Sequence, residues 1–303
     1  MSFGDRLCRA VAERQSQLAL GLDPDPARLL SGAANAAGGG SPAQAAARAV
    51  AAHCRALIAA AGPACVAVKV QLACFERLGA PGWAALADVV EAARAAGLLV
   101  IADGKRGDVP HTALAYGQAL MGSTPSPWGD VPGLGADAVT ANPLLGRDAL
   151  APIVDAARAA DGAVFVLVRT SNPGAGELQD DAPGGCEPLH MRLAALVREL
   201  GDEGPRSQGL VDVGAVVAAT EPELLGTLRE AMPHSIFLLP GVGAQGGRVE
   251  LLAPAFAPGP AAALVAASRT IVDAALDAGD PDAARYAAER LRADTWRAAA
   301  AAR

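Results

Sequence analysis

The sequence predicts an α/β protein built as one (β/α)₈ barrel, or TIM barrel, with residues 1–303 forming a single domain. Eight short apolar runs alternate with stretches of helical periodicity. This alternation is typical of a parallel sheet covered by helices, and eight units in about 250 residues are typical of the barrel. A doubly wound open sheet is the alternative. The first apolar run is not followed by a Gly-x-Gly-x-x-Gly motif, which argues against a dinucleotide-binding sheet.

The expected strands are short runs dominated by Ala, Val, Leu and Ile. In the second run, valines at every other position alternate with Ala67, Lys69 and Gln71, which is the period of a strand. The run 164–170 has the strongest β character because it combines valine with Phe165. The eight expected strands are 18–22, 66–70, 98–103, 138–141, 164–170, 213–218, 235–239 and 262–267.

Helices are expected between these strands, and loops where Gly, Pro and Ser gather. The segment 5–16 has an amphipathic pattern, and 42–61 is rich in alanine. The other expected helices are 81–96, 110–120, 147–160, 188–200, 221–231 and 270–278, with a C-terminal helical tail at 279–303. Loops are expected at 31–41, 122–135 and 171–187.

The composition is that of a protein with a large apolar core and an acidic surface. Hydrophobic residues make up 52% of the chain and the formal net charge is −7, which argues against nucleic acid or an anionic membrane as the main partner. The longest apolar tract, 251–267, contains three prolines, so we do not expect it to span a membrane.

The cysteines indicate neither a disulfide framework nor a zinc site. The chain has five, with no Cys-x-x-Cys pair and no accompanying histidine cluster: Cys8, Cys54, Cys65, Cys74 and Cys186. Charged residues from Asp5 to Arg14 stand where a signal peptide needs an apolar core. We therefore expect a soluble cytoplasmic protein without a bound metal.

Polar residues follow the predicted strands at their carboxyl ends. In a barrel these ends form the rim on which active sites are built, so we expect an enzyme. The rim residues are Asp23, Lys69, Asp103, Lys105, Thr140, Asn142, Ser171, Asn172, Thr220, Gln245 and Arg269.

The third strand ends in the motif Asp103-x-Lys105-x-x-Asp108, which is the best candidate for the catalytic centre. Lys69 and Lys105 are the only lysines in the chain, and every other basic residue is an arginine. Arginine stays protonated, whereas a lysine amine can be tuned to give or take a proton. Alternating Lys and Asp side chains could keep one another ionised while one lysine delivers a proton. The alternative is an exposed loop with an ordinary Asp–Lys pair, which contributes little.

A phosphate site is expected beside this centre. The stretch 240–247 is glycine-rich and directly follows the seventh strand, and barrels often bind phosphate after strands seven and eight. Arg269 adds a cation at the end of the eighth strand. The loop that begins with Ser171 has the composition of a mobile lid or of an ordinary surface loop.

Together these motifs resemble orotidine 5′-phosphate decarboxylases of the longer bacterial type (type 2). The similarity extends over about residues 20–271. The matching segments are GLDPDP (21–26), VKVQLACFE (68–76), IADGKRGDV (101–109), VTANPLLG (139–146), VRTSNPGAGELQ (168–179), VGAVVAAT (213–220), LLPGVGAQGG (238–247) and ASRTI (267–271).

The resemblance implies a cofactor-free homodimeric barrel that converts orotidine 5′-phosphate to UMP, the last step of pyrimidine nucleotide synthesis. Lys69, Asp103 and Lys105, with Asp108 of the other subunit, would form the catalytic network, and Lys105 would protonate C6 of the pyrimidine. The implied substrate-binding residues are Asp23 and the other subunit's Thr112 at the ribose, Ser171 at the base, and Pro240, Gln245 and Arg269 in the site that holds the phosphate.

Three other functions are compatible with parts of the pattern. A magnesium-dependent phosphosugar decarboxylase or synthase shares the Asp-x-Lys-x-x-Asp motif, but an acidic metal ligand is expected where this chain has Lys69. A Schiff-base aldolase would use Lys105 or Lys69 as its nucleophile. A non-catalytic nucleotide-binding protein would keep the phosphate site without turnover.

Overall fold

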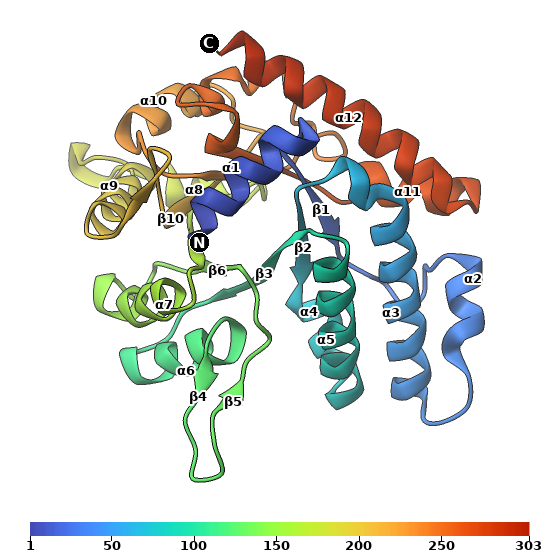
Figure 1. The fold of residues 1–303 in the computed structure, drawn as a ribbon. Coiled ribbons are helices and arrows are strands. Elements are labelled where there is room, and N and C mark those ends of the chain that lie inside the picture. The colour runs from blue at the N-terminus through green and yellow to red at the C-terminus, as the bar shows by residue number, and fades with distance from the viewer. Residues whose placement is uncertain (303) are drawn as a thin grey trace.

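The computed structural model describes residues 1–302 and contains a closed barrel of eight parallel strands (Figure 1). Each strand is hydrogen-bonded to the next barrel strand along the chain, and the last pairs with the first. The barrel prediction is confirmed, and the open sheet was the wrong alternative. The strands are β1 (Leu18–Leu22), β2 (Ala67–Gln71), β3 (Leu99–Arg106), β6 (Ala138–Ala141), β7 (Ala163–Arg169), β10 (Val213–Val217), β11 (Phe237–Pro240) and β12 (Ala263–Ala267).

Helices between the strands form the outer layer. The start of the longest of them is encoded locally: the Ser41 hydroxyl accepts a hydrogen bond from the Gln44 N–H, the Gln44 side chain accepts one from the Ser41 N–H, and Pro42 occupies the first turn. The outer helices are α3 (Pro42–Ala61), α5 (Ala80–Ala95), α6 (Pro110–Leu120), α7 (Arg147–Ala159), α9 (Leu189–Asp202), α10 (Leu224–Ala231) and α11 (Arg269–Ala278).

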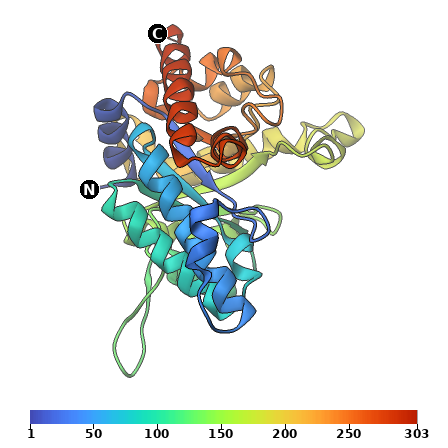
Figure 2. The same ribbon diagram turned by 90° about the vertical axis from the view of Figure 1, so that its right-hand side faces the viewer.

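The three expected loops contain short elements that hydrophobic periodicity cannot reveal. Segment 31–41 includes α2 (Ser31–Ala34) and η1 (Asn35–Ala37), and segment 171–187 includes α8 (Ala175–Gln179) and η3 (Pro183–Gly185). Segment 122–135 forms a hairpin of β4 (Ser123–Thr124) and β5 (Val131–Pro132), which projects from the barrel in Figure 2. The remaining short elements are α4 (Leu72–Glu76), η2 (Gly62–Ala64), β8 (Arg206–Ser207), β9 (Leu210–Val211), η4 (Val249–Leu251), η5 (Ala253–Phe256) and η6 (Pro260–Ala262).

The C-terminal tail contains the longest helix, α12 (Pro281–Ala301), which lies across α3 and α11 (Figure 1). The Asp280 side chain caps its first turn by accepting a hydrogen bond from the Asp282 N–H. Ala284, Ala288 and Leu291 are buried at a spacing of three to four residues, which is one face of a helix. The tail is therefore packed into the outer layer.

The first helix, α1 (Phe3–Arg14), covers the end of the barrel where the strands begin. Its buried residues Phe3, Leu7 and Val11 join the same apolar cluster as the inward-facing strand residues. The Phe3 ring meets the Phe165 ring edge to face, with the ring centroids 6.0 Å apart. Helix α1 therefore fills the end of the barrel interior where the strands begin.

We predict that Phe3→Ala destabilises the protein by about 3–5 kcal/mol, because truncation leaves a cavity against Phe165 in a close-packed interior. Urea unfolding measures the change. Tyr286→Ala, on the exposed face of α12, is the control and should cost about 0.5 kcal/mol or less. A loss below about 1 kcal/mol for Phe3→Ala would show that α1 does not seal the barrel as described.

His53 on α3 is a buried imidazole whose pKa is lowered to about 4 by burial. Its side chain is almost inaccessible, and Nδ1 lies 3.2 Å from the N–H of Leu30, from which it accepts a hydrogen bond. Only the neutral ring with an unprotonated Nδ1 can accept this bond. Protonation therefore opposes the packing of α3 against the segment around Leu30.

This arrangement predicts a loss of stability in mild acid. The unfolded chain binds a proton on His53 near pH 6.5, whereas the folded chain binds it only near pH 4. Between these values the free energy of unfolding should decrease as the pH is lowered, by up to about 1.4 kcal/mol per pH unit. His53→Asn, which keeps an acceptor near Nδ1, should remove this slope, whereas His111→Asn on the exposed start of α6 should keep it. Equal slopes in both variants would contradict the assignment.

Candidate functional site

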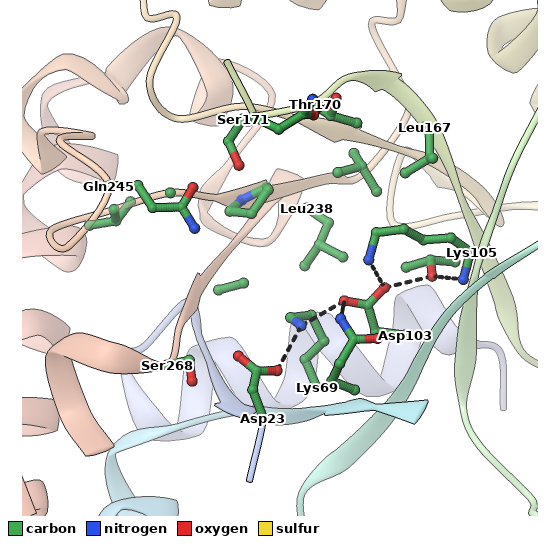
Figure 3. Close-up of a pocket in the computed structure, with 18 of the residues that line it drawn as sticks. Asp23, Lys69, Asp103, Lys105, Leu167, Thr170, Ser171, Leu238, Gln245 and Ser268 are labelled. Carbon is green, nitrogen blue, oxygen red and sulfur yellow. Dashed lines mark hydrogen bonds and ion pairs between the residues drawn. The ribbon is translucent and has the colours of Figure 1, made fainter. Parts of the chain in front are cut away.

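A cavity of about 470 Å³ opens at the carboxyl ends of the barrel strands (Figure 3). Eight of the ten site residues expected from the sequence line it: Asp23, Lys69, Asp103, Lys105, Ser171, Pro240, Gln245 and Arg269. They come from β2, β3 and β11 and from the segments that follow β1, β7, β11 and β12. Residues far apart in the sequence thus meet in one place, as the barrel requires.

The Asp103 carboxylate lies at the centre of the charged half of this cavity. Its Oδ2 atom accepts hydrogen bonds from Lys69 Nζ at 2.6 Å and from Gln71 Nε2 at 3.3 Å. Its Oδ1 atom accepts from Lys105 Nζ at 2.7 Å and from Thr140 Oγ1 at 2.8 Å. Four donors from three strands therefore hold a buried carboxylate in one orientation (Figure 3).

Strand parity explains why these side chains point inward. In β3, Ile101 packs in the barrel interior while Val100 and Ala102 face the helices, so Asp103 continues the inward row. The parallel register places Gln71 of β2 beside Asp103, and Lys69 beside Ile101. The alternation that predicted the second strand therefore also places the Lys69 side chain inside the barrel, at the end where the cavity lies.

The charges alternate along the row Asp23, Lys69, Asp103 and Lys105. Burial alone would lower the pKa of Lys69, but the Asp23 and Asp103 carboxylates outweigh it, and the pKa is raised. Burial opposes ionisation of Asp103 as well, yet Lys69 and Lys105 hold its pKa well below the usual range. Both groups are therefore ionised at neutral pH. The half-exposed Lys105 ammonium faces the open cavity.

The opposite side of the cavity suits an anion. The turn 240–247 has positive φ at Gly241, Gly243 and Gly246, and its backbone closes through a hydrogen bond from the Gly247 N–H to the Gly241 carbonyl. Gln245 and Arg269 line the cavity here, and Arg269 opens α11 at the positive end of the helix dipole. Within residues 1–302, Arg269 has no carboxylate within 4.0 Å.

The segment after β7 is held in place by hydrogen bonds of side chains to which the sequence analysis assigned no role. Arg169 is buried and donates to both carboxylate oxygens of Asp180, at 2.8 and 2.9 Å. The Gln179 side chain accepts from the Thr170 N–H at 2.8 Å and donates to the Thr170 hydroxyl. These contacts fix α8 beside Ser171. Thr170 and Gln179 line the cavity, and both lie in the segment 168–179 of the family resemblance, although neither was expected to have a role in the site.

The structure does not bring Asp108 and Thr112 to the cavity of their own chain. Asp108 follows β3 and accepts a hydrogen bond from the Val109 N–H at 2.7 Å, and Thr112 lies in the first turn of α6. Gln71 and Thr140 line the cavity although they were not among the expected substrate-binding or catalytic residues. Thr140 is a polar residue within a predicted strand, and Gln71 directly follows one in the alternating pattern of Ala67 and Lys69, which is the signal that could have identified them.

Within residues 1–302, no helix is both long and apolar enough to cross a membrane. No group of three or more His, Cys, Asp or Glu side chains is arranged to hold a metal ion in that part of the chain.

Comparisons with known proteins agree with the geometry. Residues 16–284 match the model of the orotidine 5′-phosphate decarboxylase / HUMPS family. The orotidine 5′-phosphate decarboxylase of Roseiflexus castenholzii is 39% identical over 293 residues, covering 96% of each chain. That of Deinococcus radiodurans is 45% identical over 238 residues, covering 78% of this chain and 81% of its own.

A solved structure adds support from the fold. Leishmania donovani UMP synthase superposes with a TM-score of 0.73 and is 34% identical, covering 97% of this chain. The present chain spans 56% of the length of that protein. The family match covers most of the sequence, and the Roseiflexus castenholzii relative is similar along nearly its full length. The chain therefore belongs to the orotidine 5′-phosphate decarboxylase / HUMPS family.

Proposed function

We propose that this protein decarboxylates orotidine 5′-phosphate to UMP. The observation that carries the proposal is the Asp103 carboxylate held between the Lys69 and Lys105 ammonium groups, at the rim of a barrel of this family. The cavity extends from this network to the glycine-rich turn, so it offers a charged end for the reaction and an anion site for the phosphate.

In the reaction, the bond between C6 and the carboxylate breaks and its electron pair stays on C6 as carbon dioxide leaves. Lys105 then gives a proton to C6, and its amine regains one from solvent. A fixed ammonium at this position stabilises the negative charge as it develops. Asp103 orients the Lys105 ammonium, and Lys69 balances the charge of Asp103 on the other side.

Binding of the rest of the substrate is assigned to the other side chains of the cavity. Gln245 and Arg269 hold the phosphate at the turn that begins with Pro240. Asp23, with Lys69, contacts the ribose, and Ser171 contacts the base. Contacts with the distant phosphate supply binding energy that can be used to close the site over the reacting carbon.

Asp108 and Thr112 act in this proposal across the interface of a homodimer. Both lie outside the cavity of their own chain, which fits a role in the site of a second copy. Val109 and Leu114, which are close to them in the sequence, are exposed apolar side chains, and so are Leu144 and Leu145 after β6. An interface there would cover this surface. The five cysteines are all free thiols, which fits the reducing cytoplasm.

The charged network also distinguishes the proposal from other reactions of similar barrels. A Schiff-base enzyme needs a neutral lysine amine as nucleophile, whereas the two carboxylates keep the pKa of Lys69 raised. A magnesium-dependent sugar phosphate enzyme is expected to carry an acidic ligand at the end of the second strand, where this chain has Lys69. Borohydride trapping and EDTA sensitivity would detect these two activities.

The direct test is loss of orotidine 5′-phosphate absorbance in the presence of EDTA. We predict turnover by the wild-type chain, and a fall in kcat of about 10²–10⁴-fold for Lys105→Ala, because the proton donor is lost. Arg206→Ala, an exposed cation in the β8–β9 hairpin, is the control and should retain full activity. A fully active Lys105→Ala would exclude the proposed mechanism, and an inactive wild-type chain would exclude the proposed function.

Mixing two inactive variants tests the role of Asp108. Lys105→Ala and Asp108→Ala homodimers should each be nearly inactive. After subunit exchange, about half of the dimers are mixed, and each mixed dimer has one site with neither substitution, so about a quarter of wild-type activity should return. No recovery, with exchange verified by native mass spectrometry, would place Asp108 in its own subunit's site or outside catalysis.

A further inference from the structure

The third strand contains an irregularity at the catalytic motif. Ile101 and Ala102 of β3 are in register with Ala138 and Val139 of β6, but the next paired residue of β3 is Arg106, opposite Ala141. Four residues of β3 therefore advance against two of β6. Such a bulge re-aims side chains and leaves the extra residues without ladder partners.

Lys105 lies within this bulge in a left-handed conformation, with φ at 47°. A residue with a side chain adopts this region at a cost, so its surroundings must hold it there. The Lys105 N–H donates to the Thr140 hydroxyl at 2.9 Å, and the same hydroxyl donates to Asp103 Oδ1 at 2.8 Å. One side chain on β6 thus satisfies the displaced backbone and the carboxylate together.

We propose that Thr140 is a positioning residue, whose hydroxyl holds the Lys105 backbone in the bulge so that the Lys105 ammonium stays on Asp103 and faces the reacting carbon. The role of Lys105 as proton donor rests on the proposed function. The geometry of the bulge does not depend on the proposed function. Thr140 neither gives nor takes a proton in the reaction, and it acts only through Asp103 and Lys105.

The chemistry of the residue fits this task. A hydroxyl can donate one hydrogen bond while accepting another, which is what its place between an N–H and a carboxylate oxygen requires. Threonine also has a stiff side chain in a strand, so the hydroxyl stays aimed. The simpler view is that Thr140 is a buried polar residue that has found partners. That view predicts a loss of stability on substitution without a specific effect on Lys105.

The test compares Thr140→Val, which keeps the shape and removes the hydroxyl, with Thr140→Ser, which keeps the hydroxyl. For Thr140→Val we expect kcat to fall by about 10- to 100-fold, with KM within about twofold of wild type, because the amine is misplaced after substrate binds. Thr140→Ser should stay within about threefold of wild-type kcat. If Thr140→Val does not fold, Thr140→Ala removes the same hydroxyl and takes its place.

A second measurement does not depend on turnover. Because the chain has only two lysines, NMR of protein containing isotopically labelled lysine gives two side-chain signals, assigned with Lys105→Arg. In Thr140→Val the Lys105 signal should shift or broaden while the Lys69 signal remains. If the wild-type chain does not decarboxylate orotidine 5′-phosphate, the proposed function fails, but this signal still decides the role of Thr140.

Three outcomes would overturn the proposal. One is an unchanged Lys105 signal in Thr140→Val, or in Thr140→Ala where that variant is used. Another is an active wild-type chain with kcat of the same variant within about twofold of it. The third is a rise in KM alone, which would make Thr140 a substrate-binding residue.

Discussion

The site depends on the burial of one carboxylate between two ammonium groups. Taking Asp103 and Lys69 out of water costs several kcal/mol for each ion, and their attraction repays this only if the remaining polar atoms are also satisfied. Asp103 meets that condition with four donors, and Lys69 has Asp23 3.7 Å away as a second carboxylate. Such a network is costly to form, and the fold must supply the stability elsewhere.

The barrel supplies this stability because its two ends differ: one is packed with apolar side chains and the other contains the site. At the end where the strands begin, α1 places Phe3, Leu7 and Val11 in the interior, and the Phe3 and Phe165 rings meet there. At the other end charged side chains such as Lys69 and Asp103 share the inward-facing positions with apolar ones such as Leu238, and an open cavity takes the place of a packed core. Apolar burial at one end and between strands and helices can therefore offset the desolvated charges at the other.

The parts of the site that could be predicted are those governed by local periodicity and by residue type. Strand period two places Lys69 and Asp103 inside the barrel, and the scarcity of lysine by itself draws attention to Lys105. The position of Thr140 at a strand end was visible too. The role of Thr140 could not be predicted from the sequence, because the bulge that displaces the Lys105 N–H arises only when β3 and β6 pair.

The local sequence pattern also did not predict the short elements inside the loops or the ion pair between Arg169 and Asp180. These depend on contacts between residues about ten positions apart whose spacing has no period. Asp108 and Thr112 are a different case, because the fold of one chain leaves them outside its own cavity. Their expected role came from family resemblance, and geometry within one subunit cannot supply it.

Packing also explains why the middle residue of the Asp103–Gly104–Lys105 motif is glycine. A Cβ atom at position 104 would lie 2.6 Å from Leu72 Cδ1, so only glycine lets β3 pass α4 without displacing that side chain. Gly104 and Lys105 both lie in the bulge, and Lys105 has a left-handed backbone there, a conformation that costs of order 1–3 kcal/mol. The strain falls on the residue whose amine has to reach into the cavity. The backbone of the motif therefore contributes to the site as directly as its charged side chains.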